Sequence, residues 1–419
     1  MLLSYLKIAW KVLLRRKFFT FISLFGISFT LMVLLVVAAL FDHAVGAHAP
    51  ETRLNRMLFV NFIHIRWTSG GNQNSFPSYY LLDKYVRPLK TPEKVAVYIN
   101  FHATPSYVGN QRIDLDLKYT DDVFWQVLNF SFHEGKPFGP AELKSAAHVA
   151  VINRTTARKY FGTDQGVVGR TIAVNQTNYR VQGVVEDVPV MRISSYADVW
   201  VPLTTSPNDL QNAQLNGDCG AIILAKSEAD IPAVQAEFNQ MVKRVPLPDP
   251  KNMQYLQMYA DSLLASFSRQ LMNPFTNYTS DGLALLLSIL SGLALLFMLL
   301  PALNLVNINV SRIMERSSEI GVRKAFGATS RTLIGQFLVE NIFLTAIGGL
   351  LGLLLAYVAL QLIGGAEVLA YAHFGLNWRI FGWAMLITLI FGVLSGVYPA
   401  FKMSRLQPVL ALKGGSDSK

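Results

Sequence analysis

The run FFTFISLFGISFTLMVLLVVAALF, residues 18–41, contains no charged residue. A transmembrane helix needs about 20 consecutive apolar residues, so this run is long enough to cross a bilayer. It is also longer than the apolar core of a typical secretory signal peptide, and the FDHAVGAHAP that follows is a poor cleavage site. We therefore expect an uncleaved membrane anchor, with cleavage after this run as the alternative.

Three more runs have the same character: residues 282–306 and 380–401 have no charge, and residues 333–363 have only Glu340. The chain is 52% hydrophobic and 15% charged, whereas soluble domains are roughly 25% charged. The sequence thus predicts an α-helical membrane protein with four transmembrane helices. A large segment, residues 42–281, separates the first helix from the second.

The net charge of +10 is unevenly distributed along the chain. Residues 42–281 contain 22 Lys and Arg and 22 Asp and Glu, so this segment is neutral and the excess lies outside it. Such a balance disfavours a nucleic-acid-binding role.

Basic residues gather in the short segments beside the predicted spans. Residues 1–17 hold five bases and no acid, residues 307–331 five bases and two acids, and residues 402–419 four bases and one acid. The short connection from Gly364 to Trp378 follows the third span and has no base and one acid, Glu367. By the positive-inside rule we expect both termini and the 307–332 segment in the cytoplasm. The 42–281 domain and the 364–379 loop then lie outside.

The large domain has mixed α and β signals. HVAVIN and YRVQGVVEDV are typical of strands, RTTARKYFG of a short helix ended by Gly162, and GRTIAVNQTNYRVQGVV of a hairpin around Asn-Gln-Thr-Asn. Apolar spacing predicts an amphipathic helix over 231–245 and another helix over about 257–272. Whether this domain forms one or two subdomains stays open. The one cysteine, Cys219, is expected to be a buried free thiol.

Enzyme motifs are absent from the sequence. We find no G-x-x-x-x-G-K-[ST], no H-E-x-x-H, no G-x-S-x-G and no Cys/His ligand spacing. His43 and His48 are expected to be structural or solvated, and Asp121 with Asp122 to form a solvated turn. We expect no catalytic, cofactor-binding or metal site in this chain.

The stretch ERSSEIGVRKAFGAT, residues 315–329, is a compact charged segment between two apolar runs. Glu315, Glu319 and Arg323 are spaced four apart and share one face of a helix, with Glu319 and Arg323 in the favourable order for an ion pair. Gly327 can end that helix. Two interpretations remain: an interfacial segment that touches anionic headgroups, or a docking element for a cytoplasmic partner.

Polar and small residues within the spans are expected to serve packing rather than ligand binding. Glu340 is expected to pair with Arg312 or Arg331, or else to reach the interface. Asn304 and Asn307 can form hydrogen bonds between helices. The closely spaced glycines Gly348, Gly349 and Gly352 allow close helix contact in a dimer.

Several ordered motifs resemble one known family. They are LKIAWKVLLRRKFFTFISLFGISFTL at the first span, VINRTTARKYFGTDQGVVGRTIAVNQTNYRVQGVVEDVP in the large domain, ERSSEIGVRKAFGAT, QFLVEN, GGLLG, and SGVYPAFKMSRLQPVLALK from Ser395. The sequence is similar to permeases of the MacB/FtsX-type ABC transporters, called the mechanotransmission family. These motifs cover both ends and the middle of the chain.

The resemblance implies that the cytoplasmic loop after the second span is a coupling helix that docks on an ATPase. Its expected residues are Glu315, Arg316, Glu319, Ile320, Gly321, Arg323, Lys324, Gly327 and Ala328. It further implies an inner-membrane dimer, of two copies or of this chain and a paralogue, with two ATPase subunits that bind ATP and Mg²⁺. A MacB-like periplasmic domain would then move without carrying substrate through the spans. A periplasmic adaptor and an outer-membrane duct are further implied partners.

One departure is informative, because MacB carries its ATPase before the first span and here only 17 residues precede it. We expect the ATPase to be a separate protein. The leading hypothesis is an export or extraction permease. The alternatives are an FtsX-like regulator of an envelope hydrolase and a membrane receptor without an ATPase.

Overall fold

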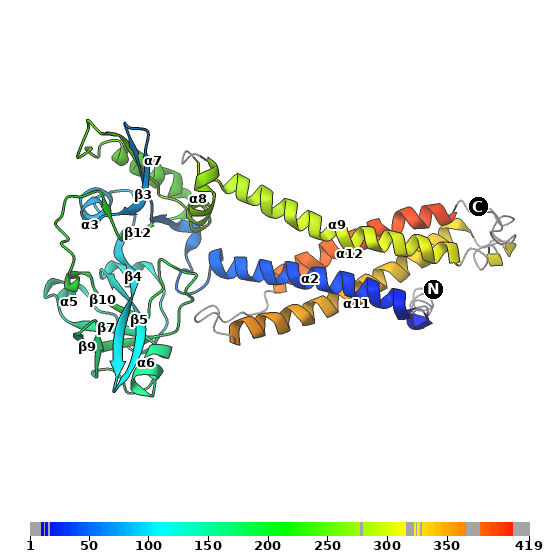
Figure 1. The fold of residues 1–419 in the computed structure, drawn as a ribbon, viewed down its shortest axis with the longest axis horizontal. Helices are drawn as coiled ribbons and strands as arrows, with labels where there is room; N and C mark the ends of the chain where they lie inside the picture. The colour runs from blue at the N-terminus through cyan, green and yellow to red at the C-terminus, as the bar shows by residue number, and fades with distance from the viewer. Residues whose placement is uncertain are drawn as a thin grey trace. The chain divides into compact units, whose positions relative to one another are not determined.

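The structure, a computed structural model, describes residues 10–11, 13–15, 17–276, 280–315, 322–323, 325–326, 329–365 and 378–404. These residues form two compact units. One is an α/β unit made of His43–Leu286, and the other is a helical unit that contains the long helices (Figure 1). The predicted fold class, four apolar helices with an α/β domain between the first and second, is confirmed.

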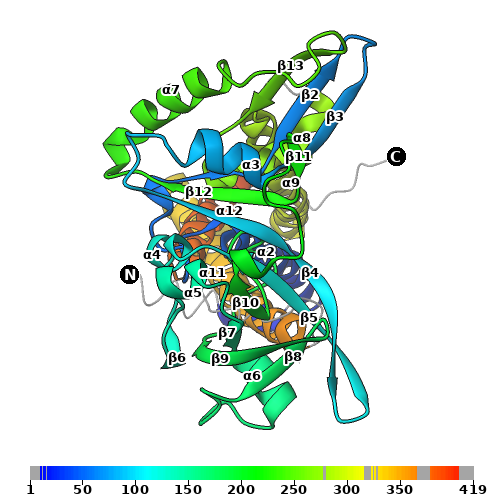
Figure 2. The ribbon, with the colours of Figure 1, turned by 90° about the vertical axis from the view of Figure 1, so that its left-hand side faces the viewer.

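A nine-stranded mixed sheet forms the frame of the α/β unit. Its strand order is β1-β12-β4-β5-β10-β7-β9-β6, with β8 paired to β9. The strands are β1 Met57–Val60, β4 Lys94–Val108, β5 Gln111–Thr120, β6 Phe132–Gly135, β7 Val149–Asn153, β8 Thr171–Val174, β9 Thr177–Val185, β10 Val199–Pro202 and β12 Cys219–Leu224. This sheet is continuous from β1 to β6. Strands β4 and β5 make a hairpin that extends beyond its neighbours (Figure 2).

Both faces of this sheet are covered, and every residue of β1, β7, β10 and β12 is buried. Alternate residues of a strand point to opposite faces. Leu58 and Val60 accordingly belong to one buried apolar cluster, while Met57 and Phe59 belong to a second. All members of both clusters come from the α/β unit, so its core is closed within that unit.

A smaller four-stranded sheet has the order β11-β3-β2-β13. Its strands are β11 Asn216–Gly217, β3 Asn72–Pro77, β2 Ile63–Trp67 and β13 Met253–Met258. The helices of the unit are α3 Tyr79–Leu81, α4 Val123–Val127, α5 Pro140–Lys144, α6 Arg154–Phe161, α7 Ile231–Val242 and α8 Leu263–Thr276. The helix predicted from residue 257 is therefore wrong at its start. Residues 257 and 258 belong to β13, where Met258 pairs with Ile63 across β2.

Local predictions for this unit are largely confirmed. Helix α6 ends at Gly162, whose φ of 76° is left-handed and suits glycine. The β8–β9 hairpin forms with a shorter turn than expected, Asn175-Gln176, both at positive φ. Cys219 is buried, and burial raises the pKa of its thiol to about 12.

The prediction for Asp121 is wrong, because its side chain is 1% exposed rather than solvated. Its carboxylate accepts hydrogen bonds from the backbone N–H groups of Val97 and Phe124, both at 2.9 Å, and from Arg87 Nη1 at 3.1 Å. Burial raises the pKa of Asp121 to about 6, although Arg87 and both N–H groups oppose the shift. Asp121 thus joins α4 to β4 inside the unit.

The helical unit contains α2 Lys17–Val45, α9 Leu283–Glu315, α11 Ser330–Gly365 and α12 Trp378–Ser404. All four are long and apolar enough to cross a membrane. Leu31 and Leu35 of α2 pack with Ala356 of α11 and Ala384 of α12. Only 6% of the apolar part of α9 is buried within the chain, against 33% for α11, so α9 offers the most apolar surface to its surroundings.

Candidate functional site

The charged segment after the second span is described only in part. Helix α9 continues to Glu315, whereas the sequence places the end of the span at residue 306. The predicted coupling residues that lie outside the described part of the chain are Arg316, Glu319, Ile320, Gly321, Lys324, Gly327 and Ala328. Of the rest, Arg323 has described side-chain contacts.

Gln336 connects Arg323 to Glu340. Arg323 Nη1 donates to Gln336 Oε1 at 3.1 Å, and Gln336 Nε2 donates to Glu340 Oε1 at 3.0 Å. An amide on its own helix is thus one described partner of Glu340. The Arg312 side chain is outside the described part, so the expected pairing with Arg312 or Arg331 stays a prediction. The i, i+4 spacing of Gln336 and Glu340 in QFLVEN could have revealed this pair.

Two apolar side chains flank Arg323 on the charged segment. Val322 is 43% exposed and Phe326, four residues later, is 88% exposed. On a helix such a pair shares one face. The segment therefore presents a large exposed aromatic ring beside its charges, a combination enriched at protein interfaces.

The glycines of α11 face other helices of the same chain. A Cβ on Gly348 would lie 2.8 Å from Ile27, and one on Gly352 would lie 2.9 Å from the backbone O of Ser28, both in α2. A Cβ on Gly349 would meet Met385 of α12 at 2.6 Å. The expected close contact of these glycines in a dimer is not what the structure shows, because all three glycines pack against helices of the same chain.

We expect Gly352→Ala to lower the free energy of unfolding of the helical unit by about 1–3 kcal/mol, because the new methyl group meets backbone that cannot move aside easily. Gly292→Ala in α9 is the matched control, since nothing lies within 4 Å of its added Cβ and alanine favours a helix. The measurement is thermal unfolding of both full-length variants in detergent. Equal transition temperatures would contradict tight α2–α11 packing.

A buried polar contact joins α11 and α12. Asn341 is 3% exposed, and its Nδ2 donates to Gly392 O at 2.8 Å. A Cβ on Gly392 would lie 2.5 Å from Thr345 Oγ1, so these two helices also meet closely. By contrast, Asn307 of α9 is exposed, and Asn304 is described only as part of the α9 backbone.

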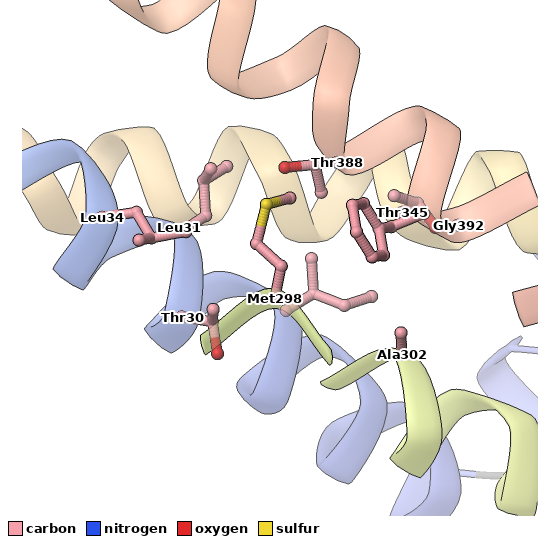
Figure 3. A pocket seen from close by; sticks show the side chains of 10 residues that line it. Thr30, Leu31, Leu34, Met298, Ala302, Thr345, Thr388 and Gly392 are labelled. Atoms are coloured by element: carbon pink, nitrogen blue, oxygen red, sulfur yellow. The ribbon is translucent and has the colours of Figure 1, made fainter. Parts of the chain in front are cut away.

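A small hollow lies between the long helices (Figure 3). Its lining residues are Ile27, Thr30, Leu31, Leu34, Met298, Ala302, Thr345, Thr388, Phe391 and Gly392. Its volume is about 30 Å³, room for only one or two water molecules. The hydroxyls of Thr345 and Thr388 donate to carbonyls of their own helices, at 2.8 and 2.7 Å. This hollow is apolar and too small for a substrate.

Within the α/β unit, a buried arginine holds the residues that follow the first span. Arg192 Nη1 donates to Glu51 Oε2 at 2.7 Å, and both side chains are fully buried. Arg192 Nη2 donates to Gly46 O at 2.7 Å and to His43 O at 3.1 Å. Carbonyls at a helix C-terminus attract cations. Arg192 therefore fixes the end of α2 to the loop that carries it, the 189–195 loop.

A buried lysine holds the same loop from the sheet. Lys118 of β5 is fully buried, and its Nζ donates to Ile193 O at 2.8 Å and to Ser194 O at 3.0 Å. Nζ also lies 4.5 Å from the ring centroid of Tyr98. Burial lowers the pKa of Lys118 to about 7, and the carboxylate of Glu51 opposes this shift.

Stability of the α/β unit should depend on pH through Lys118. Between the folded pKa of about 7 and the ordinary value of 10.5, the unfolded chain binds one more proton than the folded chain. Stability therefore rises with pH in this window, by at most about 1.4 kcal/mol per pH unit. Lys118→Met removes this dependence.

The measurement is urea unfolding of residues 43–286 at a series of pH values from about 7 to 9. The wild type should gain stability with pH relative to Lys118→Met. Lys144→Met is the control, since Lys144 is exposed. Parallel pH curves for wild type and Lys118→Met would exclude a charge change at the buried amine.

A second buried arginine holds the residues that precede α9. Arg269 of α8 is 5% exposed, and its Nε donates to Asp261 Oδ2 at 2.6 Å. Arg269 Nη1 donates to Ser280 O at 3.0 Å. The backbone of Asp261 pairs in turn with Phe59 of β1. Arg269 thus connects the chain just before α9 to the edge of the main sheet.

We call the contacts of Arg192 with Glu51, His43 O and Gly46 O the Arg192 junction, and those of Arg269 with Asp261 and Ser280 O the Arg269 junction. Neither junction was predicted from the sequence. Glu51 and Arg192 lie 141 residues apart, and neither stands in a recognisable pattern. Within the described part of the chain, no group of three or more His, Cys, Asp or Glu side chains could hold a metal ion. The two junctions and the charged segment are therefore the candidate functional features.

Comparisons with known proteins agree with this architecture. Residues 20–241 match the family model of the MacB-like periplasmic core domain, and residues 291–408 match that of the FtsX-like permease C-terminal region. The chain is 31% identical over 287 residues to the macrolide export ATP-binding/permease protein MacB of Bdellovibrio bacteriovorus, covering 67% of this chain and 41% of that protein.

MacB of Salmonella typhi is 26% identical over 420 residues, covering 97% of this chain and 60% of that protein. The chain thus spans less than two thirds of the length of these relatives. The crystal structure of the periplasmic region of MacB from Actinobacillus actinomycetemcomitans matches with a TM-score of 0.35 at 12% identity, over 49% of this chain and 88% of that one.

Four apolar helices with an α/β domain inserted after the first define a permease-type membrane subunit. The two family models together cover most of the chain. The chain belongs to the MacB/FtsX-type permeases of ABC transporters, with a MacB-like periplasmic core domain and an FtsX-like C-terminal region.

Proposed function

We propose that this chain is the permease subunit through which an ABC ATPase moves a periplasmic domain to drive export or extraction of a substrate. The main support for this proposal is the pair of buried arginine junctions. Arg192 and Arg269 each bind the backbone beside one connection to the membrane helices, through His43 O and Gly46 O or through Ser280 O. A displacement of either membrane helix would therefore be transmitted to the sheet through backbone that is hydrogen-bonded to a buried arginine.

Two further observations support mechanical work without passage of substrate through the helices. The hollow between the helices is about 30 Å³, far below the roughly 300–1,000 Å³ of a small-molecule site. The large apolar surface of α9 suits packing against a second permease, either another copy or a paralogue. Both observations leave the periplasmic domain as the part that acts on cargo.

In this proposal the charged segment of residues 315–329 docks on the ATPase in the cytoplasm. The exposed Phe326 ring beside Arg323 gives it an apolar anchor next to a charge. Residues 1–419 carry no Walker motif, so ATP and Mg²⁺ would bind to an ATPase outside these residues. Both termini of this inner-membrane subunit would lie in the cytoplasm.

The test is purification of the tagged full chain from its own host in mild detergent, followed by mass spectrometry of the retained proteins. Recovery of a Walker-motif ATPase with a periplasmic adaptor or an outer-membrane duct would support the export function. Recovery of the ATPase with an envelope hydrolase would favour the FtsX-like regulator instead. Absence of any ATPase, with the chain intact, would reject the proposal.

A further inference from the structure

Helix α8 has two very different faces. Its buried face packs within the α/β unit and consists of Ala265, Ser266, Ser268, Arg269 and Met272. Its other face exposes Phe267 at 40%, Leu271 at 50% and Phe275 at 74%. These three residues are four apart, so they form one stripe along the helix, which we call the α8 stripe. Three large apolar side chains exposed along one face of a helix indicate a surface that a partner or a lipid layer covers.

The chain itself places α8 close to the membrane. Only six residues separate Thr276, the end of α8, from Leu283, the start of the apolar helix α9. The hydrogen bond from Arg269 Nη1 to Ser280 O, at 3.0 Å, limits the distance between α8 and the start of α9 further. Ser280 is three residues before Leu283, and three residues span at most about 10 Å. The middle of α8 therefore lies near the depth at which the span enters the bilayer.

The chemistry of α8 fits a lipid surface. Its single charged residue, Arg269, points into the α/β unit and is paired with Asp261, which leaves an uncharged outer face. Aromatic rings are enriched where membrane and water meet. Helices with one apolar face lie in that layer with the face buried about 5–10 Å deep.

A second copy of the chain is a weaker occupant. At their exposures, the three side chains of the α8 stripe present roughly 300 Å² in total. A stable protein interface buries about 800 Å² on each partner. The stripe alone is too small for such an interface, whereas lipid insertion has no minimum area.

We propose that α8 is an interfacial helix whose stripe inserts into the membrane leaflet on the side of the α/β unit. Lipid then contacts α8 beside the Arg269–Ser280 hydrogen bond. The inserted helix thereby fixes how far the residues before α9 lie from the membrane surface. This inference depends on the exposed face of α8, on the contact of Arg269 with Ser280 O and on the short chain distance from Ser280 to α9. It does not depend on an ATPase or on transport.

The test uses the full-length chain in nanodiscs of phosphatidylethanolamine and phosphatidylglycerol. In a Cys219→Ala background, a polarity-sensitive fluorophore is attached at Leu271→Cys or Phe275→Cys. Tyr107→Cys is the reference, because Tyr107 is 59% exposed near the tip of the β4–β5 hairpin. Gln270→Cys is the neighbouring control, since Gln270 is exposed but about 100° from Leu271 around the helix. Variants are compared only where thermal unfolding of the chain is unchanged.

Lipids with a spin label near the headgroup should quench the fluorophores at 271 and 275 at least about twofold more than the one at 107, with 270 between them. Equal quenching at 271 and 107 would overturn the proposal. Disulfide cross-linking of Leu271→Cys between two chains, without lipid quenching, would also overturn it and would assign the stripe to a second copy.

Discussion

Glu51→Ala is expected to reduce the free energy of unfolding of the α/β unit by about 3–5 kcal/mol, the usual effect of removing one partner of a buried ion pair. Glu51 and Arg192 are both fully buried. Without the carboxylate, the Arg192 guanidinium stays buried with only neutral acceptors, His43 O and Gly46 O. Ser195 Oγ also loses its acceptor at 2.8 Å. A loss of this size is a large part of the total stability of a typical domain, about 5–15 kcal/mol.

The measurement is urea unfolding of residues 43–286, whose core is closed within this segment. Trp200 is a natural reporter, because it is fully buried and its Nε1 donates to Ser195 O at 3.2 Å. Arg112→Ala is the control, since Arg112 pairs with Asp114 at the surface and should lose less than about 1 kcal/mol.

The double variant Glu51→Ala with Arg192→Ala completes a cycle. It should lose less than the sum of the single variants, since no unpaired charge remains. A Glu51→Ala effect as small as that of Arg112→Ala would mean that water reaches the pair, and the first junction would then not be rigid.

The second large effect concerns ATPase coupling. Reversal of charge at Glu319 and Arg323 is expected to reduce stimulation of the partner ATPase by at least about tenfold, because a central interface side chain contributes 2 kcal/mol or more. Expression of the permease should remain intact. The measurement is the ATP hydrolysis rate of the purified complex in nanodiscs, together with the amount of ATPase retained on the tagged permease.

The control for this variant is Gln336→Leu. It breaks the Arg323–Gln336–Glu340 contacts but leaves every charge of the segment in place. If docking is the role of Arg323, the control should keep most of the stimulation. Equal loss in both variants would instead assign Arg323 to contacts within the chain, and unchanged stimulation in the double reversal would remove the docking role.

Features encoded over short distances were predictable from the sequence. The four spans, α6 with its Gly162 terminus, α7, and the β8–β9 hairpin each depend on patterns within about 30 residues or fewer, and the structure contains all of them. The start of α8 was not predictable, since residues 257–258 are drawn into a strand by pairing with β2, far away in sequence.

Long-range polar contacts account for the remaining differences. From the local sequence, Asp121 is typical of a turn. It becomes a buried hydrogen-bond acceptor only because the fold brings Arg87 and Val97 of β4 next to it. The same holds for the candidate site. The charges of the 315–329 segment are visible as a pattern, whereas the Arg192 and Arg269 junctions depend on partners brought together by the fold.

The two connections of the α/β unit are bound at different places relative to their membrane helices. On the first, α2 is helical without a break from Lys17 to Val45, and its terminal carbonyls are bound by Arg192. A helix of 29 residues is about 43 Å long and resists compression. On the second, Arg269 Nη1 donates to Ser280 O at 3.0 Å, three residues before α9 begins at Leu283. The first connection therefore carries an axial displacement of α2 directly to the backbone that Arg192 binds, whereas the second reaches the unit through the backbone of Ser280 that Arg269 binds.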